Sequence, residues 1–484
     1  MIGKIKAALK GTNLRARILQ GAFWLSAASA GEQAARLLRN MLLARMLAPQ
    51  AFGLMAIVLA IDGIFESFTE IGIKEAIIQN QRSKDKSYLN GAWWLSVGRS
   101  LFVYGLVFVG APWIADFYST PDLVALIRFA FLSIVFRGLM SVNAYVSLKE
   151  MRFRDWVIVF HGGGFCGICV AVVLAFVIPG VWALAIGFVT ESAMRCLLSY
   201  IICPFRPGLQ FDKDDWRALV RYSRGMIGLP ILAFIFMRAD IFVIGKLCPV
   251  SDLGLYALGA ALARAPSQFV NSVINQIMTP VFSQIQTDRT KINHAIMNFT
   301  RIIALIGFPL CFFATLYGRD ILFLSYGWSY TAMAVPFAIV FGTEFLRITS
   351  GPIAVFYLQT GRPSLHRLFT GVRAGLMLVL IVPATHWLGL TGAALAGLVS
   401  MVIAYTFQIL QVSRVNGLDM MGIVKVFLRG LLLSVAVIVV WLLSSSFLSP
   451  WPLLNLFAGI LGCLASYGLV YKGFLRPNNA FAKA

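Results

Sequence analysis

Long apolar stretches separated by short polar segments dominate the hydropathy pattern of this chain. A helix needs about 20 apolar residues to cross a bilayer, and the chain has about fourteen stretches of that length. Membrane β-strands would alternate in period two, and runs such as Val435–Leu443 do not. The pattern predicts an all-α polytopic membrane protein with helices near residues 21–45, 51–78, 88–111, 122–147, 156–178, 181–204, 224–246, 254–283, 296–317, 330–358, 364–386, 390–412, 424–447 and 451–471.

Composition and charge placement support a membrane protein. Hydrophobic residues make up 59% of the 484 residues and charged residues 13%, whereas a soluble domain carries about 25% charge. Lys and Arg gather in alternate loops, and the opposite loops carry only Arg45, Lys246 and Arg319. This positive-inside pattern predicts an even number of spans with both termini in the cytoplasm. The Lys and Arg residues that give the net charge of +21 then form a basic rim that faces anionic membrane lipids. Nucleic acid is not an expected partner.

The chain contains an internal repeat with an offset of 201 residues. The segment Arg45–Ala56 aligns without a gap onto Lys246–Ala257, and each lies between the first and second spans of a set of six. Because six is even, the two halves share one orientation, as in transporters that bind substrate between parallel repeats. We expect an N-lobe, a cytoplasmic amphipathic linker, a C-lobe, and two peripheral helices with a cytoplasmic tail, over residues 1–204, 205–223, 224–413 and 414–484.

Polar and charged residues form stripes along several of the spans. At about 100° per residue, Glu32, Arg36 and Arg39 share one arc of the first span. A cation at bilayer depth costs at least about 2.5–3.5 kcal/mol, so each must face protein, water or an anionic ligand. The second, seventh, eighth and tenth spans carry the other stripes: Asp62, Glu66 and Thr69, with Glu70 beside them; Arg238 and Asp240; Arg264, Gln268, Asn271 and Asn275; Glu344 and Arg347.

Two interpretations of these stripes compete. In the structural one, acids of the second span neutralise the arginines of the first and hold the two helices together. In the functional one, the stripes line a water-filled cavity between the halves, where guanidinium groups suit phosphate and amides suit sugar hydroxyls. The first, second, seventh and eighth spans are repeat-equivalent pairs and all four carry such groups, which favours the cavity.

Other chemical signals are weak or absent. Arg99, Arg137, Arg195 and Arg373 stand alone on their helices, and the sequence does not decide whether each pairs across helices or reaches the cavity. The chain has no P-loop, its four His share no metal-ligand spacing, and it offers no catalytic residue, cofactor site or metal site. The run His161–Gly164 is similar to an esterase oxyanion loop but lacks a nucleophile elbow, so its glycines predict close helix packing.

Several segments resemble one family of membrane transporters. They are Leu43–Gly53, Phe68–Gln79, Arg238–Lys246, Leu253–Tyr256 and Thr279–Asp288. Together they resemble the polysaccharide transporters of the multidrug/oligosaccharidyl-lipid/polysaccharide exporter superfamily, most closely the colanic-acid-exporter-like Wzx flippases. The resemblance covers roughly residues 15–420.

The resemblance implies a V-shaped pair of six-helix lobes in the bacterial inner membrane, opening alternately to each side. It implies that undecaprenyl-pyrophosphate bearing an oligosaccharide repeat unit moves from the cytoplasmic to the periplasmic leaflet for O-antigen or exopolysaccharide assembly. Arg36, Arg39 and Arg264 fit arginines used by relatives on the first and eighth spans, whereas the second span departs from the family by carrying acids. A polysaccharide polymerase and a chain-length regulator are the expected protein partners.

On this hypothesis each stripe has a role. Arg36, Arg39, Arg238 and Arg264 hold the pyrophosphate, and Gln268, Asn271 and Asn275 bind the sugars. A proton or sodium ion drives transport through one of the acids Glu32, Asp62, Glu66, Glu70, Asp240 and Glu344. A cation-coupled drug exporter of the same superfamily is the alternative, although its cavity would favour acids over arginines. A membrane polymerase or glycosyltransferase is a third class, and such enzymes usually need a long catalytic loop that this chain lacks.

Overall fold

The computed structural model describes residues 14–69, 73–80, 85–208, 217, 229–285, 288–448 and 451–474. Of the described residues 89% lie in helices, and none of them lies in a strand. This confirms the all-α membrane fold expected from the hydropathy pattern. The chain divides into two compact units, Met1–Gly254 and Leu255–Ala484. The boundaries expected for the lobes stay predictions, and the 205–223 linker lies largely outside the described residues.

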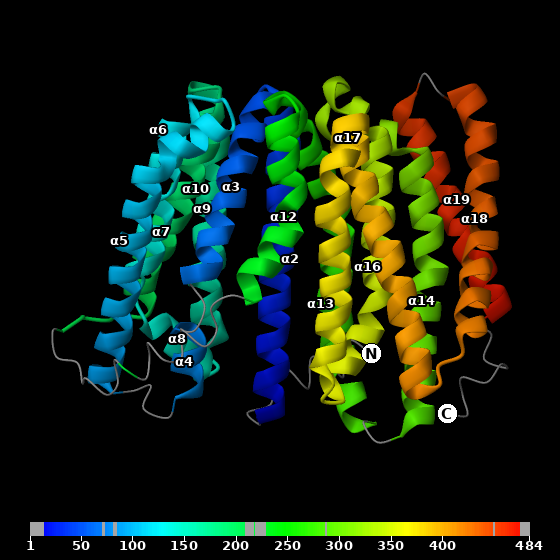
Figure 1. Ribbon diagram of the computed structural model, residues 1–484, viewed down its shortest axis with the longest axis horizontal. Helices are drawn as coiled ribbons and strands as arrows, with labels where there is room; N and C mark the ends of the chain where they lie inside the picture. The colour runs from blue at the N-terminus through cyan, green and yellow to red at the C-terminus, as the bar shows by residue number, and fades with distance from the viewer. Residues whose placement is uncertain are drawn as a thin grey trace. The chain divides into compact units, whose positions relative to one another are not determined.

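The first unit contains ten described helices and the start of an eleventh (Figure 1). The polar stripe of the first span lies on α2, and α9 and α10 pack side by side along much of their length. The helices are α2 (Leu14–Ala44), α3 (Pro49–Thr69), α4 (Ile73–Gln79), α5 (Lys86–Phe117), α6 (Leu123–Ala130), α7 (Leu132–Gly138), α8 (Asn143–Lys149), α9 (Phe153–Val177), α10 (Val181–Ile202), α12 (Leu229–Leu247) and α13 (Val250–Gln284).

The second unit is built from most of α13 and the helices that follow it. Within it α16 packs between α14 and α17, while α18 packs on both α14 and α19 (Figure 1). The helices are α14 (Arg289–Leu316), α15 (Gly318–Tyr326), a 3-10 turn η1 (Trp328–Met333), α16 (Ala334–Gln359), α17 (Pro363–Asn416), α18 (Met420–Leu448) and α19 (Pro452–Phe474).

The described parts of the expected apolar stretches lie mainly on helices, and the second stretch covers α3 and α4. Two further regions depart from a single straight helix. The fourth stretch is split into α6, α7 and α8, with a bend of 58° before Asn143. At that bend the backbone N–H of Ser141 donates to Ser199 Oγ at 2.9 Å, and the Ser141 hydroxyl donates to the carbonyl of Cys203. These bonds satisfy polar groups that no water reaches inside a bilayer.

The second exception is α17, whose 54 residues would extend about 80 Å as one straight helix, far more than a bilayer is thick. Its backbone leaves the helical region at Gly389, where φ is 55° and ψ is −134°, a conformation that glycine adopts at little cost. The eleventh and twelfth expected stretches therefore meet at this break. Within the described residues eight helices are long and apolar enough to cross a membrane, or nine with the bent pair counted as one span. The number fourteen stays a prediction.

The repeat motif marks one recurring turn between two helices. In its first copy α2 ends at Ala44 and α3 begins at Pro49, and in its second α12 ends at Leu247 and α13 begins at Val250. The offset of 201 residues therefore aligns the first turn of α3 with the first turn of α13. The two turns also touch, because a methyl carbon built on Gly53 would lie 1.9 Å from the carbonyl oxygen of Val250.

Candidate functional site

A cluster of charged side chains joins α2, α9 and α10 in the first unit. Glu191 Oε1 accepts a hydrogen bond from Nη2 of Arg36 and forms an ion pair with Nη2 of Arg195, each at 2.6 Å. Glu32 accepts from Arg36 Nε at 3.0 Å, and its second oxygen contacts Nδ1 of His161. We name these five residues the N-terminal clasp. Its two guanidinium groups face two carboxylates, so the pairs balance in charge before the imidazole is considered.

Glycines on α9 leave the space that the clasp occupies. A methyl carbon built on Gly164 would lie 2.6 Å from Glu32 Oε1. One on Gly163 would lie 2.4 Å from Arg195 Cγ, and one on Gly167 would lie 2.6 Å from Glu191 Cβ. The glycine run after His161 therefore allows α9 to approach α10 closely, as its spacing predicts.

The acids of the second span have a different partner from the one expected. Arg137 of α7 donates from Nη2 to both oxygens of Asp62, at 2.6 and 2.8 Å, and its Nη1 lies 2.6 Å from Glu66 Oε1. Ser133 adds a hydrogen bond to Asp62 at 3.3 Å. The structural alternative, in which these acids neutralise the arginines of the first span, does not hold for Arg36, because Glu32 on its own helix and Glu191 on α10 take that role.

The charged residues of the second unit form a cluster of another composition. Glu344 Oε2 accepts from Arg347 at 2.8 Å (Nε) and 2.6 Å (Nη2), while Glu344 Oε1 lies 3.9 Å from Arg264 Nε. Ser267 donates to Glu344 and accepts from Arg347 Nη2 at 3.0 Å. Arg373 of α17 lies within electrostatic range of Arg347 and Glu344. We name Arg264, Ser267, Glu344, Arg347 and Arg373 the C-terminal cluster.

The remaining expected site residues are distributed more widely. Arg39 donates to the side-chain oxygen of Asn40 at 2.9 Å. Arg238 is exposed, whereas Asp240 is 3% exposed and accepts from its neighbour's backbone N–H. Gln268 is exposed, and the amide nitrogen of Asn271 is buried with no hydrogen-bond partner among the described residues. Glu70 and the side chain of Asn275 lie outside the described residues, and the cavity expected between the halves stays a prediction.

Sequence reasoning missed three members of these clusters. Glu191 carried a usable signal, because it precedes Arg195 by four residues and shares its helix face. His161 was considered only as part of a glycine-rich run, and Ser267 gave no signal within a largely apolar helix. No group of three or more His, Cys, Asp or Glu residues able to hold a metal occurs in the part of the chain that the structure describes.

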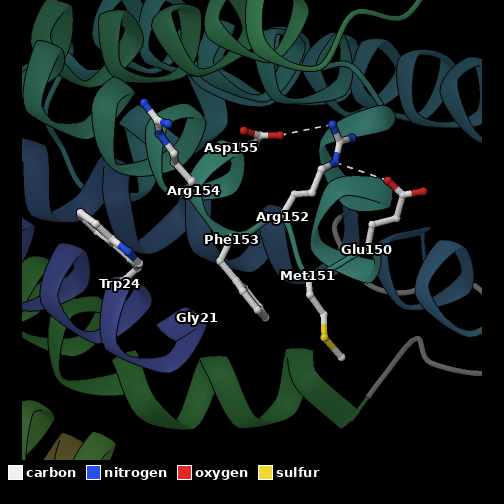
Figure 2. Close-up of a pocket in the computed structure, with 8 residues that line it drawn as sticks. All are labelled: Gly21, Trp24, Glu150, Met151, Arg152, Phe153, Arg154 and Asp155. Atoms are coloured by element: carbon white, nitrogen blue, oxygen red, sulfur yellow. Dashed lines mark ion pairs between the residues drawn. The ribbon is translucent and has the colours of Figure 1, made fainter. Parts of the chain in front are cut away.

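A pocket of about 350 Å³ lies beside the first turns of α9 (Figure 2). Trp24 of α2 contributes to its wall, and a methyl carbon built on Gly21 would lie 2.1 Å from the Phe153 ring. Arg152 pairs with Glu150 and with Asp155, each at 3.3 Å. Because two acids line this pocket beside its two arginines, it shows no preference for an anion.

Comparisons with known proteins assign the chain to a family. A family model described as "Polysaccharide biosynthesis protein" matches residues 42–335, which is more than half of the chain. The chain belongs to this family. The region that the family model matches contains Asp62 and Glu66 of α3, and His161, Glu191 and Arg195 of the N-terminal clasp. It also contains the polar stripe of α13, which begins at Arg264.

Individual members are distant relatives in sequence. The chain is 24% identical over 400 residues to the lipopolysaccharide biosynthesis protein WzxC of Escherichia coli, covering 81% of this chain and 80% of that protein. It is 25% identical to the amylovoran biosynthesis protein AmsL of Erwinia amylovora over 64% of this chain and 79% of that protein. It is 26% identical to the succinoglycan biosynthesis transport protein ExoT of Rhizobium meliloti over 56% of this chain and 55% of that protein.

Solved structures place this polysaccharide biosynthesis protein in a known fold. The inward closed conformation of the lipid II flippase MurJ matches with a TM-score of 0.77 and 14% identity, over 93% of this chain and 99% of that one. An inward-facing multidrug transporter of the MATE family matches with a TM-score of 0.59 and 13% identity, over 79% of this chain and 95% of that one. At these identities the likeness establishes the fold that the three proteins share.

Proposed function

We propose that this protein moves undecaprenyl-pyrophosphate-linked oligosaccharide repeat units from the cytoplasmic to the periplasmic leaflet of the bacterial inner membrane. Its membership of the polysaccharide biosynthesis family supports the pathway, and its relative ExoT is named as a transport protein. The fold it shares with the MurJ flippase supports alternating access. The product would serve O-antigen or exopolysaccharide assembly, with a polysaccharide polymerase and a chain-length regulator acting downstream.

The observation that carries this proposal is the gathering of arginines within apolar helices of a chain from this family. Arg347 lies 13 residues after the start of α16 and 12 before its end, close to the depth where a cation is most costly. Arg264 of α13 and Arg373 of α17 accompany it in the C-terminal cluster. A diphosphate crossing the membrane needs such groups along its path.

The roles proposed from the sequence are kept for all of these residues, and the structural observations that support them differ from residue to residue. Arg36, Arg39, Arg238 and Arg264 are the proposed pyrophosphate contacts, and Arg264 is the one that lies in the C-terminal cluster. Gln268, Asn271 and Asn275 are the proposed sugar contacts. The buried amide nitrogen of Asn271 can donate a hydrogen bond to a sugar oxygen.

Coupling to a proton or sodium ion is proposed through Glu32. Its carboxylate contacts two guanidinium groups and an imidazole at once, so a change in its charge would alter three contacts together. Asp62 and Glu66 are engaged by Arg137, and Glu344 is engaged by Arg347. Asp240 and Glu70 stay further candidates.

Transport can be measured with purified protein in proteoliposomes. Fluorescent undecaprenyl-pyrophosphate-linked oligosaccharide is placed in both leaflets, and the fraction accessible to an added impermeant quencher is followed over time. Wild-type protein should raise the rate of exchange between leaflets well above that of protein-free vesicles. An unchanged exchange rate, together with efflux of cationic dyes from the same vesicles, would instead support the drug exporter that shares this fold.

A further inference from the structure

The pocket beside the first turns of α9 combines charges of both signs (Figure 2). Arg152 and Arg154 line it together with Glu150 and Asp155, so its charged side chains balance. Its volume of about 350 Å³ lies in the range of pockets that hold small molecules. A pocket with this balance selects neither a simple anion nor a simple cation, but it matches a molecule that carries one charge of each sign.

Two of these charged groups are available to such a molecule. Arg152 lies 3.3 Å from both acids, contacting Glu150 through Oε2 and Asp155 through Oδ2. The Oδ1 atom of Asp155 takes part in no hydrogen bond or ion pair with the described residues, and the same is true of the Arg154 guanidinium. In Figure 2, Asp155 lies between Arg154 and Arg152. The pocket therefore offers a ligand one guanidinium and one carboxylate oxygen on neighbouring residues.

The position of the pocket in the chain places it at the edge of the bilayer. It lies at the first residue of α9, Phe153, and α9 is long and apolar enough to cross a membrane. No Asp, Glu, Lys or Arg occurs between Asp155 and Glu191. The Trp24 side chain, which is 56% exposed, also lines the pocket, and tryptophan is enriched at membrane–water interfaces. A ligand here would have its charged part at the level of the lipid headgroups.

The backbone determines the shape of this pocket. A methyl carbon built on Gly21 would lie 2.1 Å from the ring of Phe153, so glycine lets α2 approach the start of α9. Met151 has a φ of 59°, a left-handed conformation that is costly for a residue with a side chain. The backbone N–H of Arg152 donates to the carbonyl of Ser147 at 2.8 Å, which holds this corner between α8 and α9. The charged side chains that follow the corner are therefore placed by a defined turn.

We infer that the pocket binds the headgroup of a zwitterionic phospholipid, phosphatidylethanolamine. Its phosphate would accept hydrogen bonds from the planar guanidinium of Arg154, and its primary ammonium would donate to Oδ1 of Asp155. The glycerol and the first acyl carbons would lie against Trp24 and Met151. A choline headgroup has no N–H to donate, and a glycerol headgroup has no positive charge, so neither satisfies both groups. Such a site is independent of the cargo and goes beyond the proposed function.

A lipid in this pocket would contact two helices at once. Gly21 and Trp24 belong to α2, whereas Phe153, Arg154 and Asp155 belong to α9. Binding to the folded protein raises its stability in proportion to the logarithm of ligand concentration. In nanodiscs, a larger fraction of phosphatidylethanolamine should therefore raise the unfolding temperature of wild type, and Arg154→Gln should reduce that rise.

The direct test measures lipid binding to the purified full-length protein by native mass spectrometry. Short-chain phospholipids with ethanolamine, choline and glycerol headgroups are compared. Wild type should bind the ethanolamine lipid about two- to fivefold more tightly than the other two, the range expected for a partly exposed charge pair. Arg154→Gln and Asp155→Asn should each remove this preference. The two substitutions change the net charge in opposite directions, so a general effect of surface charge would shift the affinity upward in one and downward in the other.

Matched controls remove exposed charges outside the pocket. Arg206→Gln and Asp122→Asn should bind the ethanolamine lipid as wild type does. Arg154→Lys keeps the cation and should retain part of the preference, and thermal unfolding checks that each variant is folded. Free phosphoethanolamine should compete only weakly, since it lacks the acyl chains, and full competition would contradict a lipid as the ligand. Equal wild-type affinity for the three headgroups, or opposite shifts in the two charge variants, would overturn the site.

Discussion

Gly53 and Gly254 occupy reciprocal positions, each against the backbone carbonyl at the start of the other's helix. A methyl carbon on Gly53 would lie 1.9 Å from the oxygen of Val250, and one on Gly254 would lie 1.8 Å from the oxygen of Pro49. In the repeat, Pro49 corresponds to Val250 and Gly53 to Gly254. Two equivalent helix starts therefore cross through their equivalent glycines, and no larger residue fits at either.

Alanine at either glycine should separate the two helix starts. The clash is with backbone, which cannot rotate away, so we expect Gly53→Ala or Gly254→Ala to destabilise the protein by at least about 1–3 kcal/mol. The double variant should lose less than the sum of the single losses, because the first substitution already opens the contact. Thermal unfolding in detergent measures the effect. Gly98→Ala, where a methyl group meets nothing within 4 Å, is the control, and equal tolerance at all three positions would contradict the prediction.

Replacing Arg137 should destabilise the first unit strongly. Asp62 is 3% exposed, and both of its carboxylate oxygens accept hydrogen bonds from Arg137 Nη2. Removing one member of a buried pair leaves an uncompensated charge and typically costs about 3–5 kcal/mol. Arg137→Gln should therefore lower the midpoint of thermal unfolding well below wild type, and adding Asp62→Asn should restore part of it.

A surface pair offers the comparison for this prediction. Glu150 contacts Arg152 at 3.3 Å, and both side chains are about a third or more exposed. Such pairs contribute about 0–1 kcal/mol, so Glu150→Gln should unfold close to wild type. If Arg137→Gln unfolded at the same temperature as Glu150→Gln, the buried pair would not contribute to stability.

Much of the fold follows from the sequence, whereas the pairing of charges does not. Hydropathy predicts where helices run, and even the short gap at 387–389 between two apolar stretches marks the break at Gly389. Helical periodicity then places Glu32 and Arg36 on one face. Neither signal identifies the neighbouring helix, because the second partner of Arg36 is Glu191, 155 positions away. The contacts of Arg264, Ser267, Glu344 and Arg347 likewise depend on α13 and α16 meeting, which no local pattern encodes.

Glu32→Gln should uncouple transport from a proton gradient. The substitution keeps the size of the side chain but removes the charge that holds Arg36 and contacts His161. In proteoliposomes we expect wild-type exchange of lipid-linked oligosaccharide to change with an imposed pH gradient, and exchange by the variant to stay constant. Exchange without an imposed gradient should persist in the variant. An unaltered response to the gradient in Glu32→Gln would remove Glu32 from the coupling step.

The polar contacts between α15 and α19 should control the stability of the C-terminal helices. Asn455 of α19 donates to Asp320 at 2.6 Å and accepts from Ser444 of α18 at 2.8 Å. Asn455→Ala leaves both partners without this contact and should cost about 1–3 kcal/mol. Ser445→Ala, whose exposed hydroxyl bonds within its own helix, should unfold at nearly the wild-type temperature.

The burial of Asp320, which outweighs the opposing effect of the hydrogen bond from Asn455, should make stability depend on pH. Burial raises the pKa of Asp320 above its ordinary value of 3.8, so the folded protein holds that proton more tightly than the unfolded chain does. Stability from this group is therefore fully present in acid below the ordinary value and is lost as the pH rises through the raised one. Asp320→Asn should flatten that part of the stability profile measured by thermal unfolding. A profile that keeps the wild-type slope would contradict the assignment.

The reciprocal glycine contact is also symmetric between the two repeats. Gly53 of the first repeat contacts Val250, the counterpart of Pro49. Gly254, the counterpart of Gly53, contacts Pro49 itself. That is the contact pattern of two identical subunits related by a two-fold axis. Each copy of the turn therefore restricts the other, so a larger residue at one helix start would need a compensating backbone shift at its counterpart.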